Sequence, residues 1–547
     1  MKVWRRVIIE EHPDQNAIER TDRRHSFDRF YHRTGVTPHK LASVWRCRRN
    51  RGPHRVHAGE GAAHGAAERG SRAGSGSWRT RADLEVRPTI IKQVRNFFVQ
   101  NFGCRATQAD GAALETLLAA KGLEAAAERS HADLVVLNTC TVTQAADEDV
   151  RQTVRRVHRE NPAARILVTG CYAQRAPDEL AAMPGVEWVV GNSHKTQIAE
   201  LVGAAPYHGN IFVGDIFAQH DFLSAPVEDA AGDRTRPNLK IQDGCNNRCS
   251  FCIIPFVRGR SRSAPPDQVV EQVRSLSRRY REVVLSGINL GRWGRELGSR
   301  AQWAPRLADL IRRLLDETAI ERLRLSSVEP MDFSDDLLGL MAASARIARH
   351  VHAPLQSGCD RILRRMHRKY RPRHYADRIA KARALMPDCA VGADVMVGFP
   401  GETAADFEES RQFIESLPFT YLHVFTYSER PGTPAAEMPE QVPMPVRKER
   451  NRILRELAAR KNLDFRRGAV GRTLSVVTLH EAGAALSGNY LKVELARACE
   501  PNRLIDVEIG GVTEGGVREA GPELQGRLTI GLQVGNLPHS GEETGGQ

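Results

Sequence analysis

Residues 245–252 read CNNRCSFC, which spaces three cysteines as C-x3-C-x2-C on one tight loop. A structural zinc site closes four ligands, and no fourth Cys or His lies near this loop. Three thiolates on a cubane 4Fe–4S cluster instead leave one iron without a protein ligand. We therefore predict a catalytic cluster whose open iron chelates S-adenosylmethionine, with structural zinc as the alternative. The predicted ligands are Cys245, Cys249 and Cys252.

About six β-α units follow one another between residues 237 and 467, which predicts a parallel sheet closed into a partial barrel. The candidate strands are residues 238–242, 282–285, 322–326, 350–353, 390–397 and 421–427. Ligand-binding residues of such barrels lie at the C-terminal ends of the strands. We predict cofactor-binding residues there, the alternative for each acidic one being a paired structural charge. These residues are Ser286, Gly287, Glu329, Gln356 and Asp394.

Another β-α-β series occupies residues 92–205, and it predicts a Rossmann-like parallel sheet. Its candidate strands are residues 94–100, 133–138 and 165–170, and its candidate helices are residues 110–121 and 147–160. One cysteine follows each strand, at the edge where open α/β sheets bind ligands. The three cysteines predict a second three-thiolate site, the alternative being three small buried apolar side chains. They are Cys104, Cys140 and Cys171.

The pattern changes to short strands and glycine-rich turns after residue 468. The candidate strands are residues 474–479, 490–495, 504–509 and 527–532. They predict a small all-β barrel over residues 468–534, a fold that offers a face to RNA. Basic side chains in this barrel and beside the cysteine loop are candidates for contacts with RNA phosphates, the alternative being a solvated surface. They are Arg258, Arg260, Arg262, Arg472 and Lys492.

The ends of the chain lack core-forming patterns. Residues 1–90 hold 19 Lys and Arg against 10 Asp and Glu, so they carry most of the net charge of +13. We predict a disordered basic extension over residues 1–91, with an RNA-binding arm as the alternative. Residues 206–236 are predicted to be a linker and residues 535–547 a flexible tail. No apolar run is long enough to span a membrane and no signal-peptide core follows the basic start, which predicts a cytoplasmic protein.

Longer motifs extend the cysteine loop and the barrel. Residues 242–263 read QDGCNNRCSFCIIPFVRGRSRS, residues 353–358 read APLQSG, residues 394–403 read DVMVGFPGET and residues 486–493 read LSGNYLKV. The first three resemble the signature and barrel motifs of the radical S-adenosylmethionine methylthiotransferase family. The fourth resembles the TRAM domain, an RNA-binding β-barrel. The resemblance covers residues 93 to about 534.

Finer features resemble the MtaB branch of this family, which converts N6-threonylcarbamoyladenosine at position 37 of tRNA to its 2-methylthio derivative. These features are Asn246-Asn247, RGRSRS at residues 258–263, LSGINLG at residues 285–291 and SSVEP at residues 326–330. One departure follows Cys104. Thr107 and Ala109 stand where the family usually has Asn and Tyr, while the cysteine itself is kept.

The resemblance implies an N-terminal domain that holds a second 4Fe–4S cluster, a central partial radical-SAM barrel and a C-terminal TRAM barrel. It implies that one S-adenosylmethionine donates a methyl group and another is the source of a radical. The implied partners are tRNA and an electron donor such as flavodoxin or ferredoxin, and we expect a monomer; the sulfur donor is unknown. Two alternatives keep the chemistry but change the substrate to N6-isopentenyladenosine in tRNA or to an aspartate of a ribosomal protein. Another, from a different class, is a non-catalytic iron–sulfur RNA-binding protein.

Overall fold

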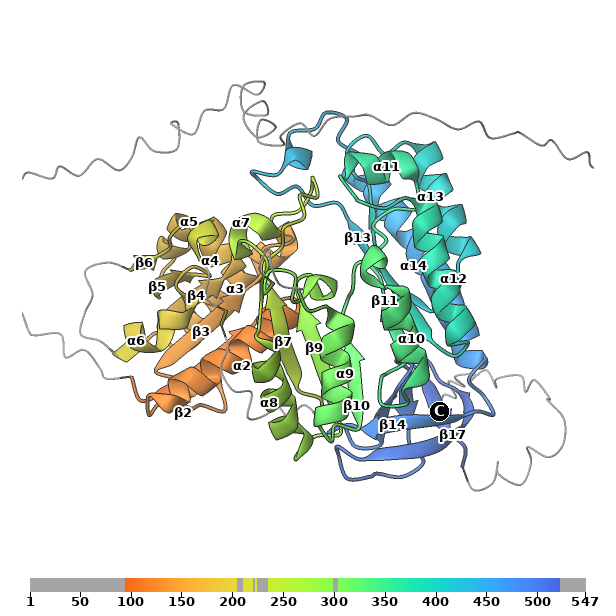
Figure 1. Cartoon of the computed structure of the whole chain (residues 1–547). Helices are drawn as coiled ribbons and strands as arrows, with labels where there is room; N and C mark the ends of the chain where they lie inside the picture. Colours follow the sequence, from red (N-terminus) through yellow and green to blue (C-terminus); the bar gives the residue numbers. More distant parts are fainter. Residues whose placement is uncertain (1–93, 204–209, 220–221, 224–234, 299–303, 522–547) are drawn as a thin grey trace, which may run out of the picture. The chain divides into compact units, whose positions relative to one another are not determined.

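The chain is described by a computed structural model over residues 94–203, 210–219, 222–223, 235–298 and 304–521 (Figure 1). All of these residues belong to one compact unit. The predicted extension at residues 1–91, the tail at residues 535–547 and the candidate strand at residues 527–532 lie outside the described residues. Among the helices that the structure describes, none is both long enough and apolar enough to cross a membrane.

The N-terminal domain is built on a parallel sheet with the strand order β2-β1-β3-β4-β5-β6. The strands are β1 (Asn96–Asn101), β2 (Glu124–Ala125), β3 (Leu134–Thr139), β4 (Arg165–Gly170), β5 (Val186–Gly191) and β6 (Ile211–Phe212). The Rossmann-like sheet expected from the sequence is therefore confirmed. The expected linker starts too early, however, because β6 pairs with β5 inside the range 206–236.

Helices cover both faces of this sheet. They are α2 (Arg105–Ala120), α3 (Gln144–Glu160), α4 (Cys171–Arg175), α5 (Pro177–Ala181) and α6 (Ile198–Gly203). Leu114 and Leu118 of α2 and Ile198 of α6 pack on one face, whereas α3, α4 and α5 pack on the other, through side chains such as Val154. A strand covered on both faces is buried along its length, and all six residues of β3 are buried, including the polar Asn138 and Thr139.

The central domain consists of two sheets, with the strand orders β10-β9-β7-β8 and β11-β12-β13. The strands are β7 (Asn238–Asp243), β8 (Arg262–Ser263), β9 (Glu282–Gly287), β10 (Arg322–Leu325), β11 (His350–His352), β12 (Ala390–Val397) and β13 (Tyr421–Thr426). All pairs are parallel except β7 with β8. A bridge between Leu323 and Ile347 joins the two sheets, so the predicted partial barrel is confirmed.

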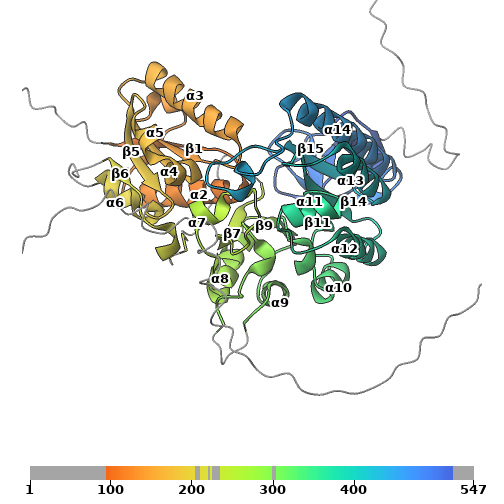
Figure 2. The same cartoon turned by 90° about the horizontal axis from the view of Figure 1, so that it is seen from above.

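One apolar cluster packs both sheets of the central domain against outer helices. The helices of this domain are α7 (Ile254–Arg258), α8 (Pro266–Ser277), α9 (Leu307–Glu317), α10 (Asp335–Ala343), α11 (Asp360–Arg365), α12 (Pro372–Leu385), α13 (Ala404–Ser416) and α14 (Met444–Arg467). Figure 2 shows α8, α9, α10 and α12 on the outer side of β7, β9 and β11. The inner face of the strands is therefore left for ligands and substrate.

The C-terminal domain is a small closed barrel with the strand order β14-β15-β16-β18-β17. The strands are β14 (Thr473–Thr478), β15 (Ala484–Ser487), β16 (Lys492–Glu494), β17 (Leu504–Val512) and β18 (Val517–Glu519). Its interior is filled by apolar side chains such as Val476, Val493 and Ile509. The predicted all-β barrel is confirmed, with β15 and β18 as strands that the sequence pattern did not indicate.

Candidate active site

The C-x3-C-x2-C loop begins where β7 ends. Gly244 has a φ of +67°, and a Cβ atom at this position would collide with the carbonyl oxygen of Arg260. The chain therefore turns sharply at a glycine and brings Cys245 against the returning strand, where its N–H donates to the carbonyl of Gly259 at 3.1 Å. All three cysteines of the loop are half-buried.

Hydrogen-bond donors approach two of these sulfur atoms. The Asn247 N–H lies 3.4 Å and the Asn289 side-chain amide 3.6 Å from Sγ of Cys245. A guanidinium nitrogen of the buried Arg368 lies 3.2 Å from Sγ of Cys249. Donors of this kind stabilise negative charge on cluster sulfurs. Sequence reasoning missed Arg368, because its neighbours in the chain carry no motif that points to the loop.

Glu329, a predicted cofactor-binding residue, acts on the same sulfur through this arginine. Its carboxylate accepts a hydrogen bond from the other terminal nitrogen of Arg368 at 2.5 Å. Gln356 also lies near the upper end of the barrel strands, with a φ of +63° and a bridge to Val395 of β12. The structure therefore brings both residues to the C-terminal side of the barrel, as their strand-end positions predicted.

Two further predicted residues, Ser286 and Gly287, end β9 beside the start of the loop. The Ser286 hydroxyl is buried and donates to the carbonyl of Leu239 at 3.5 Å, so this side chain faces the protein. Gly287 lies against Gln242, where a Cβ atom would come within 2.9 Å of the glutamine Cβ. Gly287 is nevertheless half-buried, whereas Ser286 is buried.

Cys104, Cys140 and Cys171 converge at the C-terminal edge of the N-terminal sheet. Cys104 caps α2, Cys140 follows β3 and Cys171 begins α4. Gly103 has a φ of +93°, and a Cβ atom there would lie 2.8 Å from Sγ of Cys140. Burial raises the pKa of Cys140 to about 12, and charge on the other two thiols adds to the shift. The three cysteines therefore gather at one edge of the sheet.

Thr107, which departs from the usual family residue, lies beside this set. Its hydroxyl is 3.5 Å from Sγ of Cys104 and 3.5 Å from a guanidinium nitrogen of Arg258. The threonine is fully buried. The departure therefore places a small polar group next to a predicted ligand and leaves the cysteine in position.

Arg258 does not serve the role predicted for it. Only 1% of the residue is exposed, so the expected contact with RNA phosphates is wrong. Its Nε donates to Sγ of Cys171 at 3.3 Å, and its two terminal nitrogens donate to Asp243 and Asp110, each at 3.0 Å. The arginine therefore connects the central domain to a sulfur of the N-terminal site.

The same buried carboxylates join the two domains through lysines. Asp110 of α2 pairs with Lys195 of its own domain at 3.0 Å and with Lys240 of β7. Lys240 also pairs with Asp243 at 2.9 Å. Burial alone would raise the pKa of Asp110, but the two lysines and Arg258 hold it below its ordinary value. Asp110 is therefore anionic at neutral pH and binds cations from both domains.

Helix α7 links the two cysteine sites directly. It begins two residues after Cys252 and ends at Arg258. Ile253 and Val257 pack with Cys171 in one buried apolar cluster. One end of this short segment thus follows a ligand of the first site, and the other end contacts a ligand of the second.

The other predicted RNA-binding residues differ in their surroundings. Arg260 and Arg472 are exposed. Arg262 is half-buried and donates to the carbonyls of Arg258 and Arg260 at 3.0 and 3.3 Å. Lys492 is exposed and pairs with Glu481 at 3.0 Å. Arg260 and Arg472 are thus exposed, whereas Lys492 is paired with Glu481 and Arg262 supports the loop.

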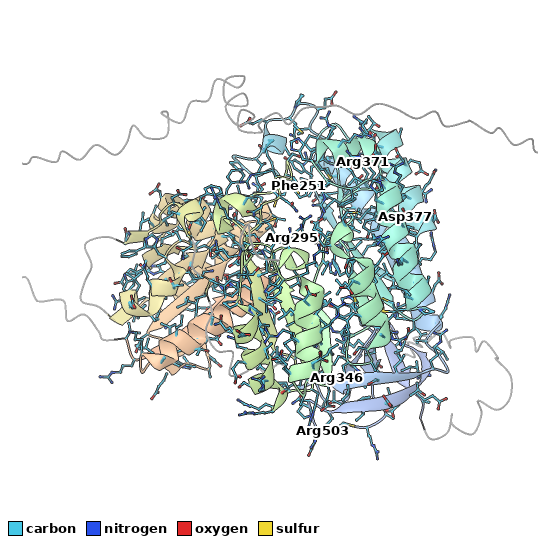
Figure 3. All side chains as sticks on the ribbon, in the orientation of Figure 1. Phe251, Arg295, Arg346, Arg371, Asp377 and Arg503 are labelled. Atoms are coloured by element: carbon cyan, nitrogen blue, oxygen red, sulfur yellow. The ribbon has the colours of Figure 1, made fainter. Side chains whose placement is uncertain are left out.

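Two cavities open beside the cysteine sites. One, of about 560 Å³, is lined by Cys104, Arg105 and Arg236 together with residues 479–481 of the small barrel. The other, of about 180 Å³, lies beside the C-x3-C-x2-C loop and is lined by Asn247, Asn289, Arg292, Arg295 and Lys369, among others. Figure 3 labels Phe251 in the loop and Arg295 at this second cavity. Both sites are therefore reachable from outside through basic surfaces.

The run LSGNYLKV at residues 486–493 docks the small barrel onto the central domain. The buried Arg324 of β10 donates to the carbonyls of Ser487 and Gly488 at 2.9 and 3.2 Å. Its guanidinium also pairs with Glu282, which is fully buried, at 2.7 Å. Tyr490, with a φ of +67°, stacks on the ring of His350 at 4.5 Å between centroids. This part of the motif therefore fixes the barrel in place.

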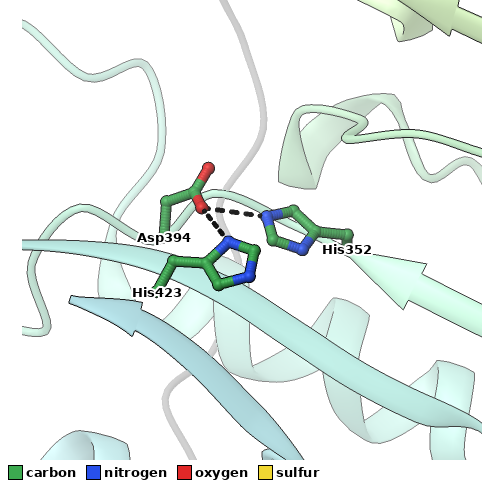
Figure 4. A group of neighbouring side chains, drawn as sticks. All are labelled: His352, Asp394 and His423. Atoms are coloured by element: carbon green, nitrogen blue, oxygen red, sulfur yellow. Dashed lines mark hydrogen bonds and ion pairs between the residues drawn. The ribbon is translucent and has the colours of Figure 1, made fainter. Parts of the chain in front are cut away.

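Asp394 of β12 lies between two histidines. One of its carboxylate oxygens lies 3.1 Å from Nε2 of His352 and 3.1 Å from Nδ1 of His423 (Figure 4). Burial opposes ionisation, but hydrogen bonds from the two histidines bring the pKa of Asp394 below its ordinary value. Sequence reasoning selected the aspartate and missed both histidines, which come from the strands on either side of β12.

Comparisons with known proteins agree with this arrangement. "Uncharacterized protein family UPF0004" matches residues 96–191, and "Radical SAM superfamily" matches residues 239–414. Threonylcarbamoyladenosine tRNA methylthiotransferase MtaB from Aquifex aeolicus (strain VF5) is 35% identical over 413 residues, which cover 75% of this chain and 99% of the relative. MtaB from Bacillus subtilis (strain 168) is 40% identical over 356 residues, covering 64% of this chain and 77% of the relative.

A tRNA-2-methylthio-N(6)-dimethylallyladenosine synthase from Thermobifida fusca (strain YX) is also similar. It is 35% identical over 398 residues, covering 72% of this chain and 80% of the relative. The matches to both family descriptions fall on the two domains that hold the cysteine sites. The chain therefore belongs to the MtaB-like methylthiotransferase family of radical SAM enzymes.

Proposed function

We propose that this enzyme replaces the hydrogen atom at C2 of N6-threonylcarbamoyladenosine, at position 37 of tRNA, by a methylthio group. The observation that carries the proposal is the pair of three-cysteine sites connected through α7 and Arg258. The printed names of the MtaB relatives support this nucleoside as the substrate. The C2–H bond is inert to acids and bases at neutral pH, which accounts for the use of radical chemistry.

A radical SAM enzyme uses a 4Fe–4S cluster and S-adenosylmethionine, and we assign the cluster to Cys245, Cys249 and Cys252. When bound, it supplies the electron that cleaves S-adenosylmethionine to a 5′-deoxyadenosyl radical. The residues fit such a group. Burial raises the pKa of Cys252 to about 12, with a further contribution from Cys249, so three thiolates at this loop need a compensating positive group.

We assign a second 4Fe–4S cluster to Cys104, Cys140 and Cys171. Cys140 fits the group for the same reason, since burial and charge on the other two thiols raise the pKa of its thiol. The guanidinium of Arg258 supplies one buried hydrogen bond to Cys171 from the opposite domain. Three protein ligands would leave one iron of such a cluster open, and that iron would supply a binding position for the sulfur of the product.

The residues around the first site position its ligands and the cofactor. Arg368 holds Cys249 and is itself held by Glu329. The backbone at Gly287 and the side chain of Gln356 face the bound S-adenosylmethionine in this proposal. Ser286 contributes through the backbone, because its hydroxyl is occupied by Leu239.

The tRNA approaches through the basic cavity beside Cys104, which reaches the small barrel at residues 479–481. Arg260, Arg472 and Lys492 bind phosphates, and the target base leaves its stack to enter the site, as enzymes that act on bases require. Flavodoxin or ferredoxin supplies electrons. The enzyme acts as a monomer in the cytoplasm, where its tRNA substrate is found.

The test compares three substrates under anaerobic conditions. Reconstituted enzyme is incubated with tRNA that carries threonylcarbamoyladenosine, with tRNA that carries isopentenyladenosine and with ribosomal protein, and the products are measured by mass spectrometry. We expect a methylthio product on the first alone. Product on none of the three, with cofactor cleavage intact, would contradict the proposal.

A second candidate substrate is N6-isopentenyladenosine in tRNA, which the name of the Thermobifida fusca relative favours. Product only on the isopentenyl tRNA would assign the enzyme to that reaction. Product only on ribosomal protein would assign it to protein modification. RNA binding without product or 5′-deoxyadenosine would indicate the non-catalytic iron–sulfur RNA-binding protein.

A further inference from the structure

The strands β11, β12 and β13 have one buried face and one open face. On β12, Val391, Ala393, Val395 and Val397 belong to the main apolar core, whereas Asp394 and Met396, on the opposite face, are partly exposed. On β13, His423 is half-exposed and Phe425 is 47% exposed. An open inner face that carries a carboxylate, an imidazole and an aromatic ring is typical of a binding site and not of a core.

The polar part of this face is held by contacts among neighbouring strands. Asp394 and His423 are paired in register on β12 and β13, and His352 of β11 completes the group (Figure 4). His352 is itself oriented by the Tyr421 hydroxyl, at 2.8 Å from its Nδ1. Within the described ranges, neither the second oxygen of Asp394 nor Nε2 of His423 has a hydrogen-bond partner. Both atoms are therefore ready to bind a polar ligand.

The lower end of this face is closed. The ring of Tyr421 lies over Gly392, where a Cβ atom would collide with it. His350 hydrogen-bonds the Tyr421 hydroxyl at 2.6 Å, and Tyr490 of the small barrel stacks on His350. A ligand at Asp394 and His423 therefore enters from the side of the cysteine loop.

The upper end of the face lies at the reaction site. Met396 follows Asp394 by two residues on the same face, a rise of about 7 Å along a strand. It packs in one apolar cluster with Phe251, which lies between Cys249 and Cys252 in the loop. Phe425 lies on the neighbouring strand, with its ring centroid 6.5 Å from that of His423. An aromatic surface and a polar pair therefore follow one another below the loop.

We propose that this face binds the substituted adenine, with the ring stacked on Phe425 and the polar N6 substituent bound by Asp394 and His423. The proposal rests on the proposed function and names the residues that select the substrate. The free oxygen of Asp394 accepts from the hydroxyl or ureido N–H of a threonylcarbamoyl group, and Nε2 of His423 donates to its carboxylate. It assigns Asp394 to the substrate and not to S-adenosylmethionine.

The arrangement explains selection against an apolar substituent. An isopentenyl group offers no hydrogen bond, so its binding would bury Asp394 and His423 beneath carbon atoms and leave their polar atoms without partners. Sites built to hydrogen-bond a substrate reject analogues that lack the polar group. The ligand class is therefore an N6-substituted adenosine with a hydroxyl or carboxylate on the substituent.

The experiment replaces His423 by Phe, which keeps an aromatic ring and removes both nitrogens. The matched control is His374→Phe on the outer helix α12, away from this face. Anticodon stem–loop RNAs carrying threonylcarbamoyladenosine or isopentenyladenosine are compared by kcat, KM and equilibrium binding. We expect His423→Phe to lower kcat/KM for the threonylcarbamoyl RNA on the order of 10- to 100-fold, mainly through KM. The ratio of kcat/KM for the threonylcarbamoyl RNA to that for the isopentenyl RNA should fall by a similar factor in His423→Phe. The His374→Phe control should match the wild type.

Different outcomes separate this inference from the proposed function. If the wild type acts only on isopentenyl RNA, the proposed function fails. If it acts on threonylcarbamoyl RNA and both His423→Phe and His423→Gln keep the full preference, only the inference fails. Circular dichroism verifies folding, and His423→Gln, which retains one hydrogen-bond donor, should lose less than His423→Phe. A stoichiometric divalent ion other than iron, present in the wild type and lost in His423→Phe, would instead show a metal site and overturn the assignment.

Discussion

Replacing Asp110 by Asn tests whether buried charge holds the two cysteine domains together. The carboxylate is 1% exposed and faces Lys195, Lys240 and Arg258, with 3.0 Å to the first and the last. Asparagine has nearly the same volume, so the change removes charge without opening a cavity. Removing one partner of a buried ion pair costs about 3–5 kcal/mol, because the remaining charge stays buried. With a urea m value of about 3 kcal/mol/M, the unfolding midpoint should fall by about 1 M.

The assay is urea unfolding of the wild type, Asp110→Asn and the exposed control Asp149→Asn on α3. The pKa of Asp110 is held below its ordinary value, so its stabilising charge is present above about pH 4 and is lost as the pH falls further. The difference in the free energy of unfolding between the wild type and Asp110→Asn should accordingly be largest at neutral pH and should decrease in acid. A variant that stays within about 0.5 kcal/mol of the wild type at neutral pH, like the control, would refute the argument.

Three further predictions concern the cofactors and the small barrel. Cys252→Ala should lower the iron content from about eight to about four per chain and abolish 5′-deoxyadenosine formation; full iron content would contradict the cluster assignment. Cys140→Ala should keep 5′-deoxyadenosine formation and lose the methylthio product, and persistent product would show that the N-terminal site is not a functional cluster. Glu282→Gln should loosen the small barrel, because Arg324 loses its buried partner, and limited proteolysis should then release residues 468–521. Burial opposes ionisation of Glu282, but Arg324 lowers its pKa to about 2. In the wild type, the stability that the Glu282 charge provides is therefore present above about pH 4.5 and is lost toward pH 2. Equal protease resistance of the wild type and Glu282→Gln at neutral pH would contradict the role of Glu282 in holding the small barrel.

The parallel sheets and the cysteine positions were predictable from local sequence. Strands covered on both faces are continuous apolar runs, as in residues 134–137 of β3. The residue that follows such a run must lie at the C-terminal edge of the sheet. This rule brings Cys140 and Cys171 together after β3 and β4, whereas Cys104 follows the partly exposed strand β1 after two further residues.

Side-chain partners from distant segments were not predictable. In the sequence, Arg258 belongs to a basic run that is typical of a solvated surface. Nothing in the neighbouring sequence indicates that it is buried and pairs with Asp110, 148 residues away. His423 lies in a strand whose alternation predicts one open face but not its pairing with Asp394 on β12. The short β18, only three residues long with Arg518 at its centre, has too little pattern to be recognised before the barrel closes around it.

The short helix α7 links the two cysteine sites and also determines the direction in which its last side chain points. Each residue of an α-helix turns the chain by about 100°, and α7 is only five residues long, with Arg258 as the last. Inserting or deleting a single residue there would swing the guanidinium far from Cys171 while the loop at Cys252 stayed as it is. The number of residues in α7 is therefore fixed by the direction that the Arg258 side chain must take. We expect relatives that keep both cysteine sites to differ in length in almost any loop before they differ in the length of α7.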